Sequence, residues 1–197
     1  MSDEDDLIAR AGQGDTAAFR TLYTRHRADV ARLVYRMLSG SADVDDVVQE
    51  VFVQVYRSLK DFRGQAKLST WIHRVAVNVV LMHRRSARSR PSDAEELPPE
   101  TTADDRSVAP DEDVERRTRV RAFAKLVDKL AEKKRTVFVL HDMEGVSPQE
   151  IAEIVGAPVL TVRTRLFYAR RELEAMIGEE PILSHVRGTF SKAGGDS

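Results

Sequence analysis

Cationic and aromatic side chains are concentrated between residues 62 and 90, a stretch without a single acidic residue. Arginines suit phosphate groups, and aromatic rings stack on unpaired bases, so this mixture is typical of a surface that binds single-stranded nucleic acid. A core helix with a solvated basic face is the alternative interpretation. The residues concerned are Phe62, Arg63, Gly64, Gln65, Trp71, Arg74, Asn78, Arg84 and Arg85.

The second half of this stretch has the periodicity of a helix, whereas residues 62–67 have the character of a loop. We expect the helix to begin near Ser69, with Ser69 or Thr70 as its N-cap. One face is apolar and therefore predicted to be core, and the opposite face carries the arginines and Asn78. The predicted core positions are Trp71, Ile72, Val75, Ala76, Val79 and Met82, with Trp71 at the seam between the two faces.

Carboxylates form a second group on a helix predicted for residues 43–59. Asp43, Asp46 and Glu50 fall together on the far side, with Gln49 and Val53 close by, and the predicted core side carries Val44, Val47, Val48, Val51, Phe52 and Val55. The helix dipole favours acidic residues near the helix start, but it does not explain Glu50 or an exposed valine. Because carboxylates repel nucleic acid, this face suits a protein partner that carries arginines. No histidine or glycine-rich loop lies nearby in the sequence, so we expect contacts rather than acid–base catalysis.

The third group is at the carboxyl-terminal side. Ser147 to Glu150 form a capping box with proline at the first helical position, and residues 156–158 turn the chain into a second helix. Two short helices joined by a glycine turn predict a helix-turn-helix whose second helix enters a major groove. Its predicted DNA-facing residues are Thr161, Arg163, Thr164, Phe167, Tyr168 and Arg171. The alternative is an ordinary helical hairpin with arginines for solubility.

The helices predicted around these three groups of residues indicate an all-α chain of two small helical domains. We place the first domain at residues 1–90 and the second at 114–178, joined by a flexible acidic linker at 91–113, with a tail of unassigned role at 179–197. The linker loses apolar periodicity and is rich in proline and acid, which is typical of disorder. The apolar stripe of the last helix is Val159, Val162, Leu166, Ala169, Leu173 and Met176.

Composition limits the function classes. The chain has 197 residues, a formal net charge of −1 and no cysteine, which excludes disulfides and thiolate metal sites. No stretch reaches the length of a membrane span and the start is acidic rather than signal-like, so we expect a cytoplasmic protein. Motifs for phosphate loops, HExxH zinc sites and GxSxG nucleophiles are missing, and the histidines do not cluster. We therefore expect neither an enzyme nor a cofactor or metal.

Three sequence segments resemble the extracytoplasmic-function group of bacterial sigma factors. They are DVDDVVQEVF from Asp43, FRG and STWIHRVAVN between Phe62 and Asn78, and SPQEIAEIVGAP followed by TVRTRLFYARREL. The resemblance covers the chain from about Asp6 to Ile177. It implies a dissociable RNA polymerase subunit, made of the sigma-two and sigma-four domains, that recognises promoters and starts their melting.

The resemblance also implies roles for individual residues. Asp46, Gln49 and Glu50 match positions that hold the clamp coiled coil of the polymerase beta-prime subunit. Residues 62–65 match the loop that captures a flipped base of the minus-ten element, with Trp71 and Asn78 on the helix beside it. Arg163, Thr164, Phe167 and Tyr168 match positions that read the minus-thirty-five element.

The implied partners are core RNA polymerase, through its beta-prime clamp and beta subunit, and promoter DNA in duplex and single-stranded form. An anti-sigma factor is a further candidate partner. The chain departs from the family pattern at Leu160, where many members have glycine, and at Tyr168, which is often arginine.

Two other classes fit parts of the sequence. A homodimeric helix-turn-helix regulator would bind a palindrome without polymerase. A serine recombinase would need a positioned nucleophile, and Ser86 and Ser89 stand in a run that has the character of a solvated segment. Neither class explains the carboxylates at Asp46 and Glu50.

Overall fold

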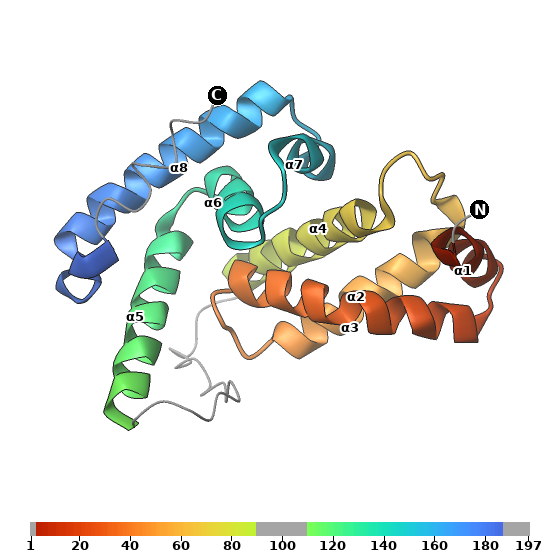
Figure 1. The fold of residues 1–197 in the computed structure, drawn as a ribbon, viewed down its shortest axis with the longest axis horizontal. Helices are drawn as coiled ribbons and strands as arrows, with labels where there is room; N and C mark the ends of the chain where they lie inside the picture. Colours follow the sequence, from red (N-terminus) through yellow and green to blue (C-terminus); the bar gives the residue numbers. More distant parts are fainter. Residues whose placement is uncertain (1–2, 90–109, 187–197) are drawn as a thin grey trace. The chain divides into compact units, whose positions relative to one another are not determined.

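The computed structural model describes residues 3–89 and 110–186, and in the second range it describes the side chains of residues 114–183. The described residues are largely helical and include no strand, which confirms the all-α prediction. They divide into two compact units, one with α1 to α4 and the other with α5, α6, most of α7, and α8 (Figure 1). Residues 91–109 of the predicted linker lie outside the described residues.

The first unit is a helical bundle. Its elements are α1 (Asp3–Gly12), α2 (Thr16–Met37), α3 (Val44–Ser58), the short 3₁₀ turn η1 (Leu59–Asp61) and α4 (Leu68–Ser89). The helices α2, α3 and α4 each contact the other two, and α1 packs on α2 and η1. The fully buried residues at their centre are mostly β-branched or long aliphatic, which fill a helix–helix core in few rotamers. They include Val30, Leu33, Val34, Met37, Val51, Ala76 and Val80.

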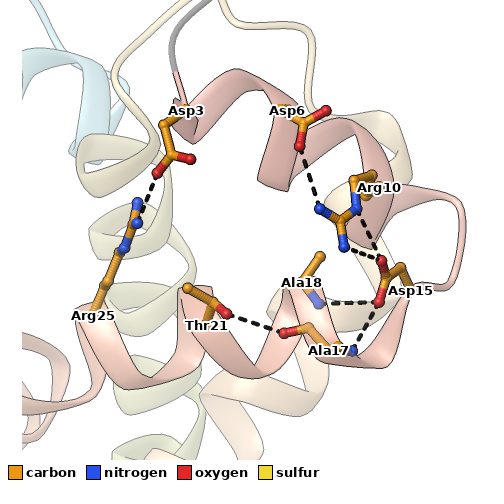
Figure 2. Close-up of polar contacts among 8 residues, drawn as sticks. All are labelled: Asp3, Asp6, Arg10, Asp15, Ala17, Ala18, Thr21 and Arg25. Atoms are coloured by element: carbon orange, nitrogen blue, oxygen red, sulfur yellow. Dashed lines mark hydrogen bonds and ion pairs between the residues drawn. The ribbon is translucent and has the colours of Figure 1, made fainter.

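The long helix α2 begins at a side-chain cap. Asp15 accepts hydrogen bonds from the backbone amides of Ala17 (2.9 Å) and Ala18 (3.0 Å), two of the donors that a helix start leaves unsatisfied. Its other carboxylate oxygen accepts from Arg10 of α1, at 2.7 Å from Nη2. Figure 2 shows this arrangement, in which a single carboxylate both caps α2 and joins it to α1.

The loop before α4 is confirmed, but the start of the helix is not where the sequence predicted. Helix α4 begins at Leu68, and Thr70 is buried within its first turn, so neither Ser69 nor Thr70 is the N-cap. Met82, predicted to be core, is 67% exposed. The prediction failed there because Met82 lies on the outer side of α4, in line with the exposed Arg74 and Asn78, although it continues the apolar spacing.

The second unit contains α5 (Pro110–Lys129), α6 (Glu132–Phe138), the π-helical turn η2 (Val139–Met143), α7 (Pro148–Val155), α8 (Val159–Glu179) and the 3₁₀ turn η3 (Pro181–Val186). Helix α8 packs against α5, α6 and η3. The predicted capping box is confirmed, since Ser147 Oγ accepts from the Glu150 amide at 3.2 Å while Glu150 Oε2 accepts from Ser147 Oγ at 2.8 Å. Gly156 has a φ of 61°, the left-handed conformation that favours glycine at the turn into α8.

Two details of the second unit differ from the sequence prediction, and the burial of Arg135 and Leu183 was not predicted at all. Helix α5 begins at Pro110, inside the predicted linker range of 91–113. Ile177, rather than Met176, is the buried residue at the end of the α8 stripe. Arg135 is fully buried in α6, where its Nη1 donates to the Asp128 carbonyl at 3.1 Å. Leu183, in the predicted tail, is also buried.

We predict that Asp15→Asn removes a pH-dependent part of the stability. The Ala18 amide and then Arg10 lower the pKa of the Asp15 carboxyl below its ordinary value of 3.8. Because the folded pKa is the lower one, the contribution of the charge is fully present above pH 3.8 and is lost as the pH falls through the folded pKa. Asparagine keeps a capping oxygen without the charge.

Thermal unfolding from pH 7 to pH 2, followed by circular dichroism, tests this prediction. The wild type should melt above Asp15→Asn at neutral pH, and the gap should close in acid. Asp29→Asn is the control, because Asp29 is an exposed carboxylate on the same helix whose ion pair is with Arg32, three residues further on. A gap that stays constant with pH would show that the charge of Asp15 is unimportant.

Candidate functional site

The exposed side of α4 carries a row of residues at three- and four-residue spacing. Arg74, Asn78, Met82 and Arg85 are exposed, and Trp71 at the start of the row is half-buried. We call these five residues the α4 stripe. Such spacing places side chains on one side of a helix, so the stripe combines cations, an amide and two large apolar groups on one surface.

Arg84 does not belong to this stripe. It is half-buried, and its Nη1 donates to the carbonyl of Met37 at 2.8 Å, at the end of α2. The last carbonyls of a helix have no partner within the helix, so this arginine satisfies one of them and joins α4 to α2. Arg84 is therefore positioned differently from the stripe, and its predicted contact with nucleic acid stays a prediction.

The loop between η1 and α4 lies beside the first residue of the stripe. The rings of Phe62 and Trp71 are tilted against each other with centroids 5.3 Å apart. Arg63 and Gln65 are exposed, and Gly64 has a φ of 68°, which a residue with a side chain adopts only with strain. The loop thus places a cation and an amide next to an aromatic pair that still has accessible surface.

The predicted carboxylate face of α3 is present in the structure. Asp46, Gln49, Glu50 and Val53 are all exposed, with Val53 46% accessible. We call these four residues the α3 face. Tyr56 extends the same row and is also exposed, although the sequence analysis did not single it out. The signal that would have found Tyr56 is its three-residue spacing from Val53.

The two carboxylates of the α3 face differ from their neighbours in pairing. Among the residues that the structure describes, none forms an ion pair with Asp46 or Glu50. By contrast, Asp43 is 3.3 Å from His83 Nε2, and Asp45 is 3.7 Å from Arg27 Nη2. Asp43 and Asp45 thus have partners within the first unit although both stay exposed, whereas the α3 face keeps its negative charge toward solvent.

The predicted recognition helix α8 has the expected exposed side. Arg163, Thr164, Phe167, Tyr168 and Arg171 are exposed, and Thr161 is half-buried. Their spacing opposes the buried stripe that contains Val162, Leu166 and Ala169. Leu160, which the sequence analysis noted only as a departure from the family pattern, is 75% exposed in the first turn.

Helix α8 is tied to α6 and η2 by polar contacts that no local pattern predicts. Arg170 donates to both oxygens of Asp142, from Nε at 2.9 Å and from Nη2 at 2.5 Å. These bonds raise the pKa of the Arg170 guanidinium above its ordinary value. Lys134 pairs with Glu172, and its Nζ lies 5.9 Å from the centre of the Tyr168 ring. The contacts hold α8 so that its arginine-rich side faces away from the unit.

The described ranges contain neither a cluster of metal ligands nor a helix that could span a membrane. No group of three or more metal-ligating side chains is found there. None of the helices in those ranges combines the length and the apolar character that crossing a bilayer requires.

Comparisons with known proteins agree with the division into two units. Residues 22–90 match Sigma-70 region 2, and residues 121–173 match Sigma-70, region 4. The chain is 36% identical to the ECF RNA polymerase sigma-E factor of Haemophilus influenzae, over 87% of this chain and 93% of that protein. It is 34% identical to the Escherichia coli K12 sigma-E factor over 85% and 91%, and 30% identical to the RNA polymerase sigma-H factor of Pseudomonas aeruginosa over 91% and 95%.

Solved structures show a similar fold. CnrH, determined in complex with the cytosolic domain of CnrY, aligns with a TM-score of 0.67 and 27% identity over 91% of this chain and 99% of that one. The sigma factor RpoE of Bartonella quintana, in complex with NepR, aligns with a TM-score of 0.62 over 82% and 98%, and its 18% identity makes it a likeness of fold. With both regions matched in order and relatives aligned over nearly their whole length, the chain belongs to the ECF family of RNA polymerase sigma factors.

Proposed function

We propose that this sigma factor binds core RNA polymerase through the α3 face, opens the minus-ten element with the α4 stripe and the loop at residues 62–65, and reads the minus-thirty-five element with α8. The observation that carries the proposal is the segregation of charge. The α3 face has two carboxylates that form no ion pair with any residue that the structure describes, whereas the α4 stripe and the exposed side of α8 carry cations. One surface suits a basic protein, and the other two suit a polyanion.

The polymerase contact is supported by the chemistry of the α3 face. Carboxylates at Asp46 and Glu50 are available for arginine or lysine, and Val53 beside them adds apolar area. Interfaces of this kind gain specificity from charge and part of their affinity from burial of the apolar centre. The beta-prime clamp coiled coil is the surface that the family resemblance implies, and the beta subunit is proposed as a second contact.

Melting is supported by the aromatic pair and the α4 stripe. An unpaired base can stack on the accessible part of the Phe62–Trp71 pair, while Asn78 offers a donor and an acceptor to a base edge. Arg74 and Arg85 flank Asn78 along the stripe and suit the phosphates of the displaced strand. Met82 adds an apolar group, a type of side chain that minor-groove proteins insert between base steps.

Upstream recognition is supported by α8 as the second helix of a helix-turn-helix. Arg163 and Arg171 are exposed on its outer side, so they can reach base edges or phosphates of a duplex. The structure of the Bartonella quintana sigma factor RpoE, which is similar in fold, contains the anti-sigma factor NepR. An anti-sigma protein is therefore included as a candidate partner that would compete with polymerase.

We predict that Asp46→Arg with Glu50→Arg abolishes assembly with core polymerase. Reversing charges at a contact with a basic coiled coil should cost on the order of several kcal/mol, whereas the same change on a solvated face costs little. Co-purification with core enzyme measures the loss, and circular dichroism checks the fold. Asp45→Arg is the matched control, because Asp45 is also in the first turn of α3 but lies off the α3 face. Equal assembly of double mutant and control would refute the contact.

We predict that Phe62→Ala with Asn78→Ala blocks promoter opening while leaving closed-promoter binding nearly unchanged. Extruding a base costs a few kcal/mol of unstacking, which the altered pocket no longer offsets. Permanganate reactivity of promoter thymines on a duplex should fall sharply. A template with a pre-melted bubble should restore much of the activity, since the opening cost is removed. If the mutant opens the duplex as fast as the wild type does, the melting role is wrong. Helix α4 is then a core helix with a solvated face.

We predict that Arg163→Ala relaxes sequence preference at one upstream position. A bidentate base contact contributes roughly 1–3 kcal/mol of discrimination, whereas losing a phosphate contact weakens binding to all sequences alike. Selection of a randomised upstream element by mutant and wild-type holoenzyme distinguishes these outcomes. If both select the same sequences, Arg163 does not read a base.

A further inference from the structure

The outer side of α8 has an apolar centre that phosphate or hydrogen-bond contacts do not explain. Leu160 is 75% exposed and Phe167 is 57% exposed. They are seven residues apart, about two helical turns, and so lie on the same side of α8. Isolated exposed apolar residues are ordinary, but two in line on a DNA-facing helix form a contact surface.

The residue between them adds to this apolar character. Thr164 is exposed, and its Oγ1 donates to the Leu160 carbonyl at 2.9 Å. Its hydroxyl proton is thus used within the helix, which makes it unavailable as a donor to a base. Arg163 and Arg171 are exposed on the same side, and residues 154–171 contain no acidic side chain. The neighbouring charged residues on this side of α8 are therefore arginines.

The ring of Phe167 has an aromatic neighbour on α8 that restricts its motion. Tyr168 packs edge-on against it, with centroids 5.3 Å apart and an interplanar angle of 77°. Tyr168 in turn lies beneath the ammonium group of Lys134, which pairs with Glu172. Because these contacts restrict the aromatic pair, Phe167 offers a fixed apolar surface that loses little freedom on binding.

We infer that Leu160 and Phe167 form an apolar strip that reads the 5-methyl groups of thymines in the upstream promoter element. The thymine methyl is the apolar group that a major groove displays, and apolar side chains recognise it by contact. The arginines around the strip favour a polyanion as its partner. A protein surface without acidic groups would not attract them. The inference rests on the proposed function of α8 and adds to it a base-specific contact made without hydrogen bonds.

Replacement of single thymines by deoxyuridine tests the strip, because the change removes one methyl group and leaves all hydrogen-bonding groups of the base. The probe is a promoter duplex that the wild-type holoenzyme selects from genomic DNA, with each upstream thymine replaced in turn. Competition binding is measured with holoenzymes that contain wild type, Leu160→Ala or Phe167→Ala. Leu160→Met keeps the apolar contact and serves as the conservative variant.

At one or more positions, deoxyuridine should weaken wild-type binding by about fourfold, the effect of leaving one methyl group unburied. That penalty should disappear in Leu160→Ala or Phe167→Ala and persist in Leu160→Met. A structural defect would instead weaken binding to all duplexes and leave the penalty in place, which overturns the inference. Wild-type binding that is insensitive to every replacement also overturns it. If the holoenzyme fails to respond to the upstream element at all, the proposed function of α8 fails as well.

Discussion

Burial of apolar helix faces against one another is the constraint that decides which side chains of this protein can bind anything. In the first unit, α2, α3 and α4 all use one side for a shared core that includes Val34, Val51 and Ala76. Each helix is left with a single outer side. The carboxylates of Asp46 and Glu50 and the arginines of the α4 stripe therefore lie on the outer sides of two different helices.

Polar contacts within the protein then determine which charged residues remain available. Asp43 lies 3.3 Å from His83, Asp45 lies 3.7 Å from Arg27, and Arg84 donates to the Met37 carbonyl. In the second unit, Arg170 is likewise used within the protein, because it donates a hydrogen bond to Asp142. A sequence shows all of these residues as equal candidates for binding, whereas the fold separates those used in packing from those that face solvent. The net charge of −1 thus hides surfaces of strong and opposite local charge.

The features that the sequence predicted well depend on neighbours within about one helical turn. The capping box at Ser147 and the exposed row from Asp46 to Val53 are of this kind, because helix geometry alone relates their residues. The features that it missed depend on distant partners. Arg84 meets Met37 across 47 residues, and Arg170 meets Asp142 across 28. Met82 was misassigned because periodicity predicts a helix face but not how far the neighbouring helices cover it.

The central claim is that this chain redirects core RNA polymerase to promoters that the core enzyme does not use alone. In vitro transcription of a genomic DNA library by core polymerase, with and without the protein, tests it most directly. Addition of the protein should produce transcripts that start at discrete sites preceded by a shared pair of upstream motifs. Identical transcripts with and without the protein would contradict the account, as would binding of the free protein to a palindrome as a dimer.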